Sequence, residues 1–265
     1  DYGGSGATPS SWGRIYCEGA GSDNSLLKNV EVRYGGNAVM RVSSYGHYAS
    51  VVLMSSGATL ENVQIKNSPT WFYSPGTNPS YPYNTIYYYT TGIFAYMGKP
   101  TLKGIEVTNK HQYGIALYGA MTNAQVTGGK FSNCVSGAWL YSTSGLKLEN
   151  CEFSNNENYG IEALYPGTTS ILNNTFSGNV NTGLYAYSGN SLTVEGNTFS
   201  GGSYDITTSY GYPTINSNTF DKGIAIQGTI SGKSGIANGQ TAHHILGTVT
   251  VDPTASLAFS QPGQV

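Results

Sequence analysis

Apolar and polar positions repeat with a period of about 22 residues through the middle of the chain. One phrase, a glycine followed by alternating apolar and polar positions, recurs at residues 92–96, 114–118, 137–141, 160–165 and 183–187, and each copy ends in tyrosine. A large apolar residue closes the second half of each period, at Val107, Phe131, Phe153, Phe176, Phe199 and Phe220. This regularity predicts a repeat architecture, in which each unit buries its apolar face only against its neighbours.

Within one period the alternation lasts only four to six positions before Gly, Asn or Ser interrupts it. That pattern predicts short strands separated by turns, and no helix of ten residues fits between residues 92 and 228. The strands are either antiparallel hairpins of a sandwich or stacked coils of a solenoid. Parallel stacking places like residues on like, so repetition of residue type at each position favours the solenoid.

Eight copies share the spacing between the closing apolar residue and a second apolar position five residues before it: Leu27, Leu60, Leu102, Val126, Leu148, Ile171, Val194 and Ile215. Three residues further on, the last three copies carry Asn174, Asn197 and Asn218. Stacked at a bend, these amides would bond to one another and to turn backbone, which predicts a structural asparagine ladder rather than a ligand site.

The phrase Gly-Ile-x-Leu, with Asn-Asn-Thr-Phe-Ser-Gly-Asn at residues 173–179, resembles the repeat of right-handed parallel β-helices. These form the pectate-lyase-like superfamily and its NosD-like repeat branch. The resemblance implies an all-β solenoid of about eight to ten coils over residues 12–230. Residues 1–11 would be a tail, and residues 231–265 a C-terminal coil or coils serving head-to-tail assembly. The superfamily holds lyases, hydrolases, epimerases, adhesins and scaffolds, so the fold does not fix the function.

Two early periods are too long, which places inserted residues in loops on one face. The larger insertion is rich in aromatic residues: Trp71, Phe72, Tyr73, Tyr81 and Tyr83. An exposed loop of this composition is expected to pack on something.

Charged residues make up only 10% of the chain and the net charge is −2, which gives no electrostatic basis for nucleic acid or an acidic membrane surface. No apolar run reaches the ~18 residues of a membrane span. No signal peptide is recognisable, so a chain beginning at Asp1 is expected to be a mature product or a fragment. Few Lys and Arg, many Tyr and hydroxyls, and a glycosylation sequon at Asn173 indicate an extracellular or cell-surface protein.

Three cysteines, Cys17, Cys134 and Cys151, lack metal-ligand spacing. They are expected to be buried free thiols, with a Cys134–Cys151 bridge as the alternative.

The acid clusters that the resemblance to polysaccharide lyases or galacturonan hydrolases would imply are not in the sequence. Glu106, Lys130 and Glu152 fall on successive periods, either as a surface charge stack or as a catalytic glutamate pair. His47, His111 and the pair at residues 243–244 are expected at solvent or at an interface. No catalytic residue, metal site or cofactor is predicted.

An outward aromatic stripe follows from the alternation: Phe94, Tyr96, Tyr118, Trp139, Tyr141, Tyr165, Tyr185 and Tyr187. Three interpretations remain open: ring stacking that stabilises an exposed face, a sugar-binding platform, or a contact surface for another subunit.

The two ends of the chain look circularly shifted. Residues 245–263 resemble the opening coil of surface β-helices. In those proteins the opening coil comes before two further phrases, but in this chain the matching phrases stand at residues 12–16 and 27–36, near the start. Head-to-tail stacking would bury both open ends, and a heterologous contact that does not close makes a filament; alternatively, the chain is one module of a longer array. The sequence therefore predicts a non-enzymatic structural protein that assembles with copies of itself, and alternatively a carbohydrate-binding or polysaccharide-degrading one.

Overall fold

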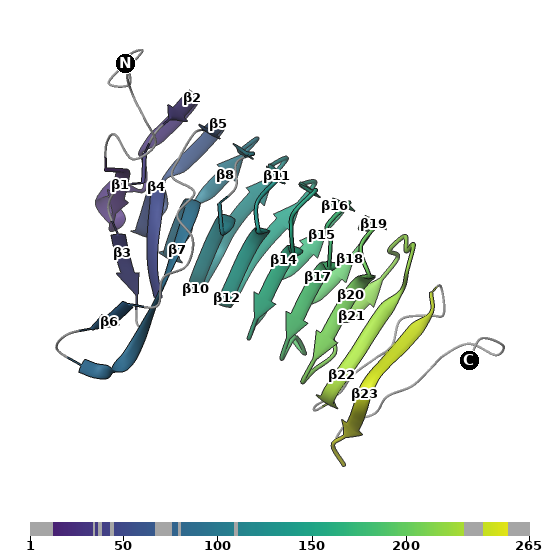
Figure 1. Cartoon of the computed structure of the whole chain (residues 1–265). Helices are drawn as coiled ribbons and strands as arrows, with labels where there is room; N and C mark the ends of the chain where they lie inside the picture. Colours follow the sequence, from purple (N-terminus) through teal and green to yellow (C-terminus); the bar gives the residue numbers. More distant parts are fainter. Residues whose placement is uncertain are drawn as a thin grey trace.

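The computed structural model describes residues 13–33, 35–36, 39–42, 45–66, 76–78, 81–108, 111–230 and 241–253. Its strands stack in columns, each strand parallel to its equivalent one coil later (Figure 1). The first column contains β1 (Ile15–Glu18), β4 (Tyr45–Ser56), β7 (Tyr81–Gly98), β10 (Tyr113–Thr127), β12 (Ser136–Glu149), β14 (Tyr159–Leu164), β17 (Thr182–Tyr187), β20 (Tyr204–Ser209), β22 (Ile224–Ile230) and β23 (His243–Val251).

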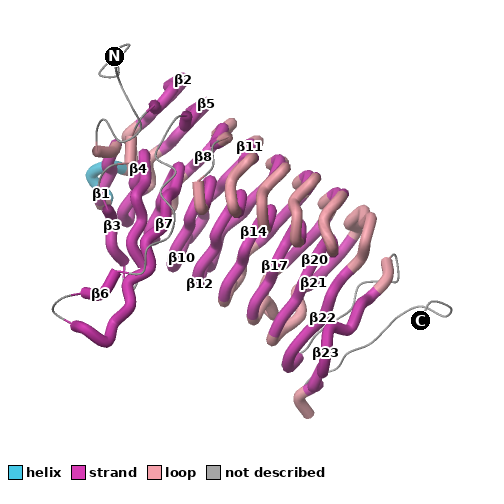
Figure 2. The backbone as a smooth tube through the Cα atoms, viewed as in Figure 1, coloured by secondary structure: helices cyan, strands magenta, loops and turns pink. Residues whose placement is uncertain are grey.

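Two further columns complete each coil. The second contains β2 (Leu26–Arg33), β5 (Thr59–Lys66), β8 (Thr101–Lys103), the later parts of β10 and β12, β15 (Ser170–Leu172), β18 (Thr193–Glu195) and β21 (Thr214–Asn216). The third contains the ends of β2 and β5, then β9 (Glu106–Val107), β11 (Lys130–Ser132), β13 (Glu152–Ser154), β16 (Thr175–Ser177) and β19 (Thr198–Ser200). The predicted all-β solenoid is confirmed; among the described residues the only helical turn is η1 (Ala20–Ser22), drawn cyan in Figure 2.

The register places like residues on like, as the period predicts. Leu148 of β12 pairs with Ile171 of β15, which pairs with Val194 of β18. The closing phenylalanines form a stacked ladder inside the coil, with ring centroids 5.3 Å apart for Phe131–Phe153 and 4.6 Å apart for Phe176–Phe199. One contiguous apolar core therefore runs through the rod.

The glycine that opens each phrase is required by close approach between coils. A Cβ added to Gly160 would lie 2.5 Å from the carbonyl oxygen of Gly183 and 2.7 Å from Cδ1 of Phe176. The equivalent glycines of the neighbouring coils meet the same kind of obstruction. Any side chain at this position would displace either the next coil or the phenylalanine ladder.

Asparagine side chains satisfy the backbone at two bends. Asn174 Nδ2 donates to Asn197 Oδ1 at 3.0 Å, and Asn197 Nδ2 donates to Asn218 Oδ1 at 3.0 Å, as the sequence predicts. A second ladder, absent from the sequence interpretation, joins Asn156 Nδ2 to Asn179 Oδ1 at 2.8 Å.

In the coil before each asparagine ladder begins, a cysteine occupies the equivalent position: Cys151 before Asn174, and Cys134 before Asn156. The backbone N–H of Cys151 donates to Asn174 Oδ1, and that of Cys134 donates to Asn156 Oδ1. None of the three cysteines forms a disulfide, as predicted; Cys134 and Cys151 are buried, Cys17 is half-buried, and burial raises the pKa of Cys134 to about 12. Cys134 and Cys151 thus serve as small buried side chains of the two bends.

Both insertions contain antiparallel hairpins rather than loops alone. β3 (Val39–Val42) pairs with the start of β4, and β6 (Gly76–Asn78) pairs with the start of β7, which extends beyond the rod (Figure 1). β4 and β7 also pair with each other in this region, from Tyr45 and Tyr87 onward. The inserted residues therefore lengthen first-column strands. Of the predicted loop residues, Trp71, Phe72 and Tyr73 lie outside the described residues, and Tyr81 and Tyr83 are described only as backbone of β7.

Candidate functional site

Six tyrosines line the outer face of the first column and form what we call the tyrosine ladder: Tyr96, Tyr118, Tyr141, Tyr165, Tyr187 and Tyr210. Successive ring centroids lie between 5.0 and 5.8 Å apart. Tyr210 was not predicted, because the phrase before it, Asp205-Ile-Thr-Thr, lacks the glycine and the apolar alternation of the other copies.

The first part of this face is covered. Phe94 and Trp139 are only 0% and 1% exposed, so the prediction that they belong to an exposed stripe is wrong. The extended start of β4 and β7 supplies Tyr45 and Tyr89, which pack on this small outer core, and His47, whose ring contacts both Phe94 and Trp139. Tyr45 meets Trp139 edge to face, with ring centroids 5.3 Å apart. The residues that lengthen β4 and β7 thus bury outward aromatic rings that the repeat alone would leave in water.

His47 lies inside this outer core. Its ring stacks on Phe94, its Nδ1 is 3.0 Å from Thr91 Oγ1, and burial lowers its pKa to about 3. His111 is also buried, and burial lowers its pKa to about 4. The prediction that these two histidines lie at solvent or at an interface is therefore wrong; both are neutral residues of the interior.

The two adjacent histidines of β23 attach the last strand to the rod. His243 Nε2 lies 3.1 Å from the hydroxyl of buried Tyr212, and His244 Nε2 lies 3.0 Å from the carbonyl oxygen of Lys222. They contact different elements, as expected for neighbours on a strand, and do not share a ligand position.

The later part of the tyrosine ladder is open to solvent. Tyr165 is 49% exposed and Tyr210 is 48% exposed. The ring of Tyr165 stands nearly perpendicular to both neighbours, with interplanar angles of 71° to Tyr141 and 73° to Tyr187. This part of the ladder is free to meet another molecule.

The carboxylate of Glu162 lies on the outer face of the first column, between the part that the outer core covers and the part that is open to solvent. Glu162 of β14 is in register with Trp139 of β12 on one side and Tyr185 of β17 on the other. The hydroxyl of Tyr113 is 3.4 Å from its Oε2, and Tyr159 stacks on Tyr185 beside it, with centroids 5.2 Å apart. Burial raises the pKa of Glu162 to about 7. Its signal in the sequence is an acid at a position that is aromatic in the adjacent copies.

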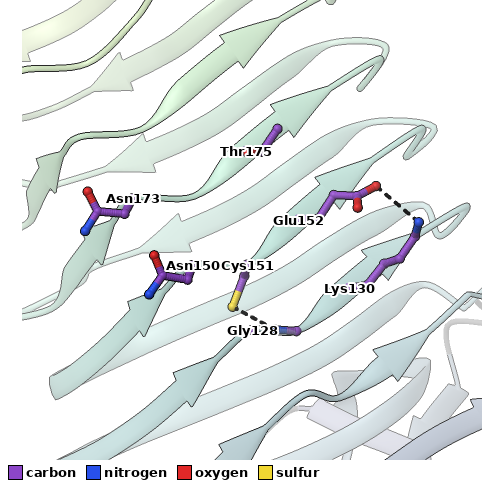
Figure 3. A pocket seen from close by; sticks show the side chains of 8 residues that line it. Gly128, Lys130, Asn150, Cys151, Glu152, Asn173 and Thr175 are labelled. Carbon is purple, nitrogen blue, oxygen red and sulfur yellow. Dashed lines mark hydrogen bonds and ion pairs between the residues drawn. The ribbon is translucent and has the colours of Figure 1, made fainter. Parts of the chain in front are cut away.

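The predicted charge stack lies on another face, over the third column. Lys130 is in register with Glu106 and Glu152, and its Nζ is 3.4 Å from Glu152 Oε1 (Figure 3). The two glutamates are two coils apart with a lysine between them, so the arrangement is a surface ion ladder.

A groove of about 420 Å³ adjoins the charge stack, with Asn150, Cys151 and Asn173 in its lining (Figure 3). Burial raises the pKa of the Cys151 thiol to about 11, so the thiol is a poor nucleophile. Asn173, the sequon residue, is exposed at a turn with φ 54°. Within the described residues no three His, Cys, Asp or Glu side chains gather to hold a metal ion. Nor does any helix in that part of the chain have the length and apolarity to span a membrane.

The two ends of the first column are the remaining candidate surface. β1 and β23 are its first and last strands, and the register continues coil by coil from Cys17 on Leu53 to Ile226 on Ile245. Ile15 and Cys17 of β1 are only partly buried at one end, and Ile245 of β23 is 49% exposed at the other. Both ends therefore present apolar side chains beside a strand edge.

Comparison with known proteins bears on the fold alone. A solved structure of HetL, a pentapeptide repeat protein involved in heterocyst differentiation regulation from the cyanobacterium Nostoc sp. strain PCC 7120, aligns with 81% of this chain and 89% of its own. The identity is 13% and the TM-score 0.23. No curated protein matches the sequence. The family model described as the right handed beta helix region matches residues 14–165 and 77–220, and the chain belongs to this family.

Proposed function

We propose that this chain is a non-enzymatic structural β-helix of the cell exterior, which assembles end to end into a filament, sheath or surface layer. The observation that carries the proposal is the placement of β1 and β23 at opposite ends of one parallel column. Because both strands run in the same direction, β23 of one copy can pair with β1 of the next in the register that the column already uses.

The inward side chains would continue the core across such a junction. Ile15 would stack on His243 and Cys17 on Ile245, since each pair occupies equivalent positions of the column. Ile245 and Val251 of β23 would lose exposed apolar surface, at about 25 cal/mol per Å² buried. The contact is heterologous and does not close on itself, which is the geometry of a filament.

The composition supports a location outside the cell. Only 10% of the residues are charged, and Tyr, Ser, Thr, Asn and Gly dominate the sequence. The sequon residue Asn173 lies exposed on a turn, as a glycosylated asparagine of a secreted protein would.

Assembly is tested by light scattering after size exclusion, and by negative-stain imaging, over a range of concentrations. The wild-type chain should form rods as concentration rises. Ile15→Lys and Ile245→Lys should each keep it monomeric, because either places a charge in the junction between β1 and β23. Val180→Lys, at a position 65% exposed, is the matched control and should assemble like wild type. A wild-type chain that stays monomeric throughout, or charge variants that assemble normally, would refute the proposal.

A second candidate function, carbohydrate binding, is favoured by the open part of the tyrosine ladder. Tyr165, Tyr187 and Tyr210 offer aromatic surface on successive coils, and Tyr and Trp rings combine apolar area with a polar group. A glycan array followed by Tyr187→Ala would test it: binding that survives the substitution unchanged removes the ladder as the platform. The polysaccharide-degrading alternative would require product release by the same chain, measurable as new reducing ends or unsaturated products.

A further inference from the structure

Glu162 is a carboxylate that lies among aromatic rings. Trp139 precedes it in the column and Tyr185 follows it. Tyr113 reaches it from β10 with a hydroxyl at 3.4 Å, and its charge also acts on Tyr159. Among the described residues no Lys, Arg or His side chain forms an ion pair with Glu162. The apolar repeat does not require an acid here, since the equivalent positions are aromatic in both neighbouring coils.

We propose that Glu162 and the surrounding rings of Tyr113, Trp139, Tyr159 and Tyr185 form a binding site for an organic ammonium ion. The inference is independent of end-to-end assembly, because the site lies in the middle of the first column, away from β1 and β23.

The chemistry of the cluster matches that ligand class. Aromatic rings attract a cation through the negative charge of their faces, and the attraction grows when water is excluded. The carboxylate supplies the counter-charge, while the tyrosine hydroxyls offer further acceptors. An alkylated ammonium ion is more weakly hydrated than a metal ion and exposes apolar surface to the rings. Calcium, which takes six to eight oxygen ligands, is poorly served by one carboxylate.

Proton binding and cation binding compete at this site. The titratable groups that face Glu162 are Tyr113 of β10, Tyr159 of β14 and Tyr185 of β17, and the pKa of each is raised. They stay neutral near pH 7, and Trp139 carries no charge. His47, whose ring contacts Trp139, is neutral as well, since burial lowers its pKa. Affinity for a cation should therefore rise with pH as Glu162 ionises around pH 7.

Calorimetric and NMR titrations of the full chain with choline, tetramethylammonium and n-butylammonium test the proposal. Choline and tetramethylammonium probe a free quaternary ion, and n-butylammonium probes the end of a lysine side chain. Saturable binding of at least one cation is expected, stronger at about pH 8 than at about pH 6. The neutral carbon isostere of choline should bind at least about tenfold more weakly than choline itself.

Matched variants separate the site from general charge effects. Glu162→Gln keeps the shape and should weaken cation binding about tenfold or more, whereas Glu152→Gln, which removes an exposed charge beside Lys130, should leave it unchanged. The Ile245→Lys chain should bind like wild type, whether or not the wild type assembles. Failure of every cation to bind, equal binding of the neutral isostere, or full affinity in Glu162→Gln would overturn the proposal.

Discussion

The imidazole of His47 stacks on the ring of Phe94, with ring centroids 4.3 Å apart and planes inclined by 18°. His47 comes from the lengthened start of β4, and Phe94 from the outward face of β7. The contact shows that the insertions are packed parts of the fold, and that the rod has a second, smaller core outside its coils. A neutral, buried histidine in that core has a measurable consequence for stability in acid.

His47→Phe should make the protein less sensitive to acid. The pKa of His47 is lowered from 6.5 to about 3, so its contribution is present above pH 6.5 and lost as pH falls towards 3. At about pH 4.5 the loss should be roughly 2–3 kcal/mol, from 1.36 kcal/mol per unit. Denaturant unfolding at about pH 7 and pH 4.5 measures it; an equal drop in wild type and variant would assign the acid sensitivity elsewhere, with buried His111 the next group to test.

Asn197→Ala should destabilise the fold by roughly 2–4 kcal/mol, because it leaves several buried partners without a hydrogen bond. Asn197 donates to Ile171 O and Asn218 Oδ1, and accepts from the backbone N–H of Asn174. Asn181→Ala is the control: it removes an exposed hydrogen bond to Asn158 and one to the side chain of Tyr159, and leaves the buried ladder in place. Chemical unfolding should show a clearly larger loss of unfolding free energy for Asn197→Ala than for Asn181→Ala. Similar losses in the two variants would mean that the asparagine ladder adds little to stability.

Gly160→Ala should cost about 1–3 kcal/mol or more through overpacking. The added methyl would lie 2.5 Å from the Gly183 carbonyl oxygen, so the coil above must shift. Gly21→Ala is a matched change, since nothing lies within 4 Å of a Cβ placed there. Thermal unfolding of both variants gives the comparison, and a wild-type midpoint for Gly160→Ala would show that neighbouring coils adjust freely.

Glu162→Gln should change how stability depends on pH even without a ligand. Burial raises the pKa of this carboxyl from 4.5 to about 7, so its contribution is present below pH 4.5 and lost as pH rises through 7. The variant should gain stability relative to wild type over that range, by about 1 kcal/mol after allowance for partial exposure. Difference curves from unfolding at several pH values measure this gain. If the unfolding free energies of variant and wild type changed with pH in the same way, Glu162 would not ionise between pH 4.5 and 7.

The columns could be predicted from the sequence because each coil repeats the geometry of the last. Leu148, Ile171 and Val194 recur at a fixed spacing, and parallel pairing translates that spacing directly into vertical contact. The Asn174–Asn197 bond follows from the same rule. Because successive coils are related by a shift along the rod axis, residues one period apart in the sequence become neighbours in the structure.

The outer core could not be predicted in this way, because it depends on residues outside the period. The alternation correctly turns Phe94 and Trp139 outward from the coil, but their burial is decided by Tyr45 and His47, which lie in an insertion. No spacing rule links Tyr45 to Trp139, nearly a hundred residues later. Tyr113, which reaches Glu162, likewise lies just before a repeat phrase rather than within it.

The common direction of all first-column strands gives the rod two unlike ends. A polymer built from it would be polar, with β1 exposed at one terminus and β23 at the other, and the two termini would grow at different rates. A chain carrying Ile245→Lys could still add through its intact β1 end and then block the next addition. Small amounts of that variant should therefore shorten wild-type filaments from one end only, which would reveal their polarity.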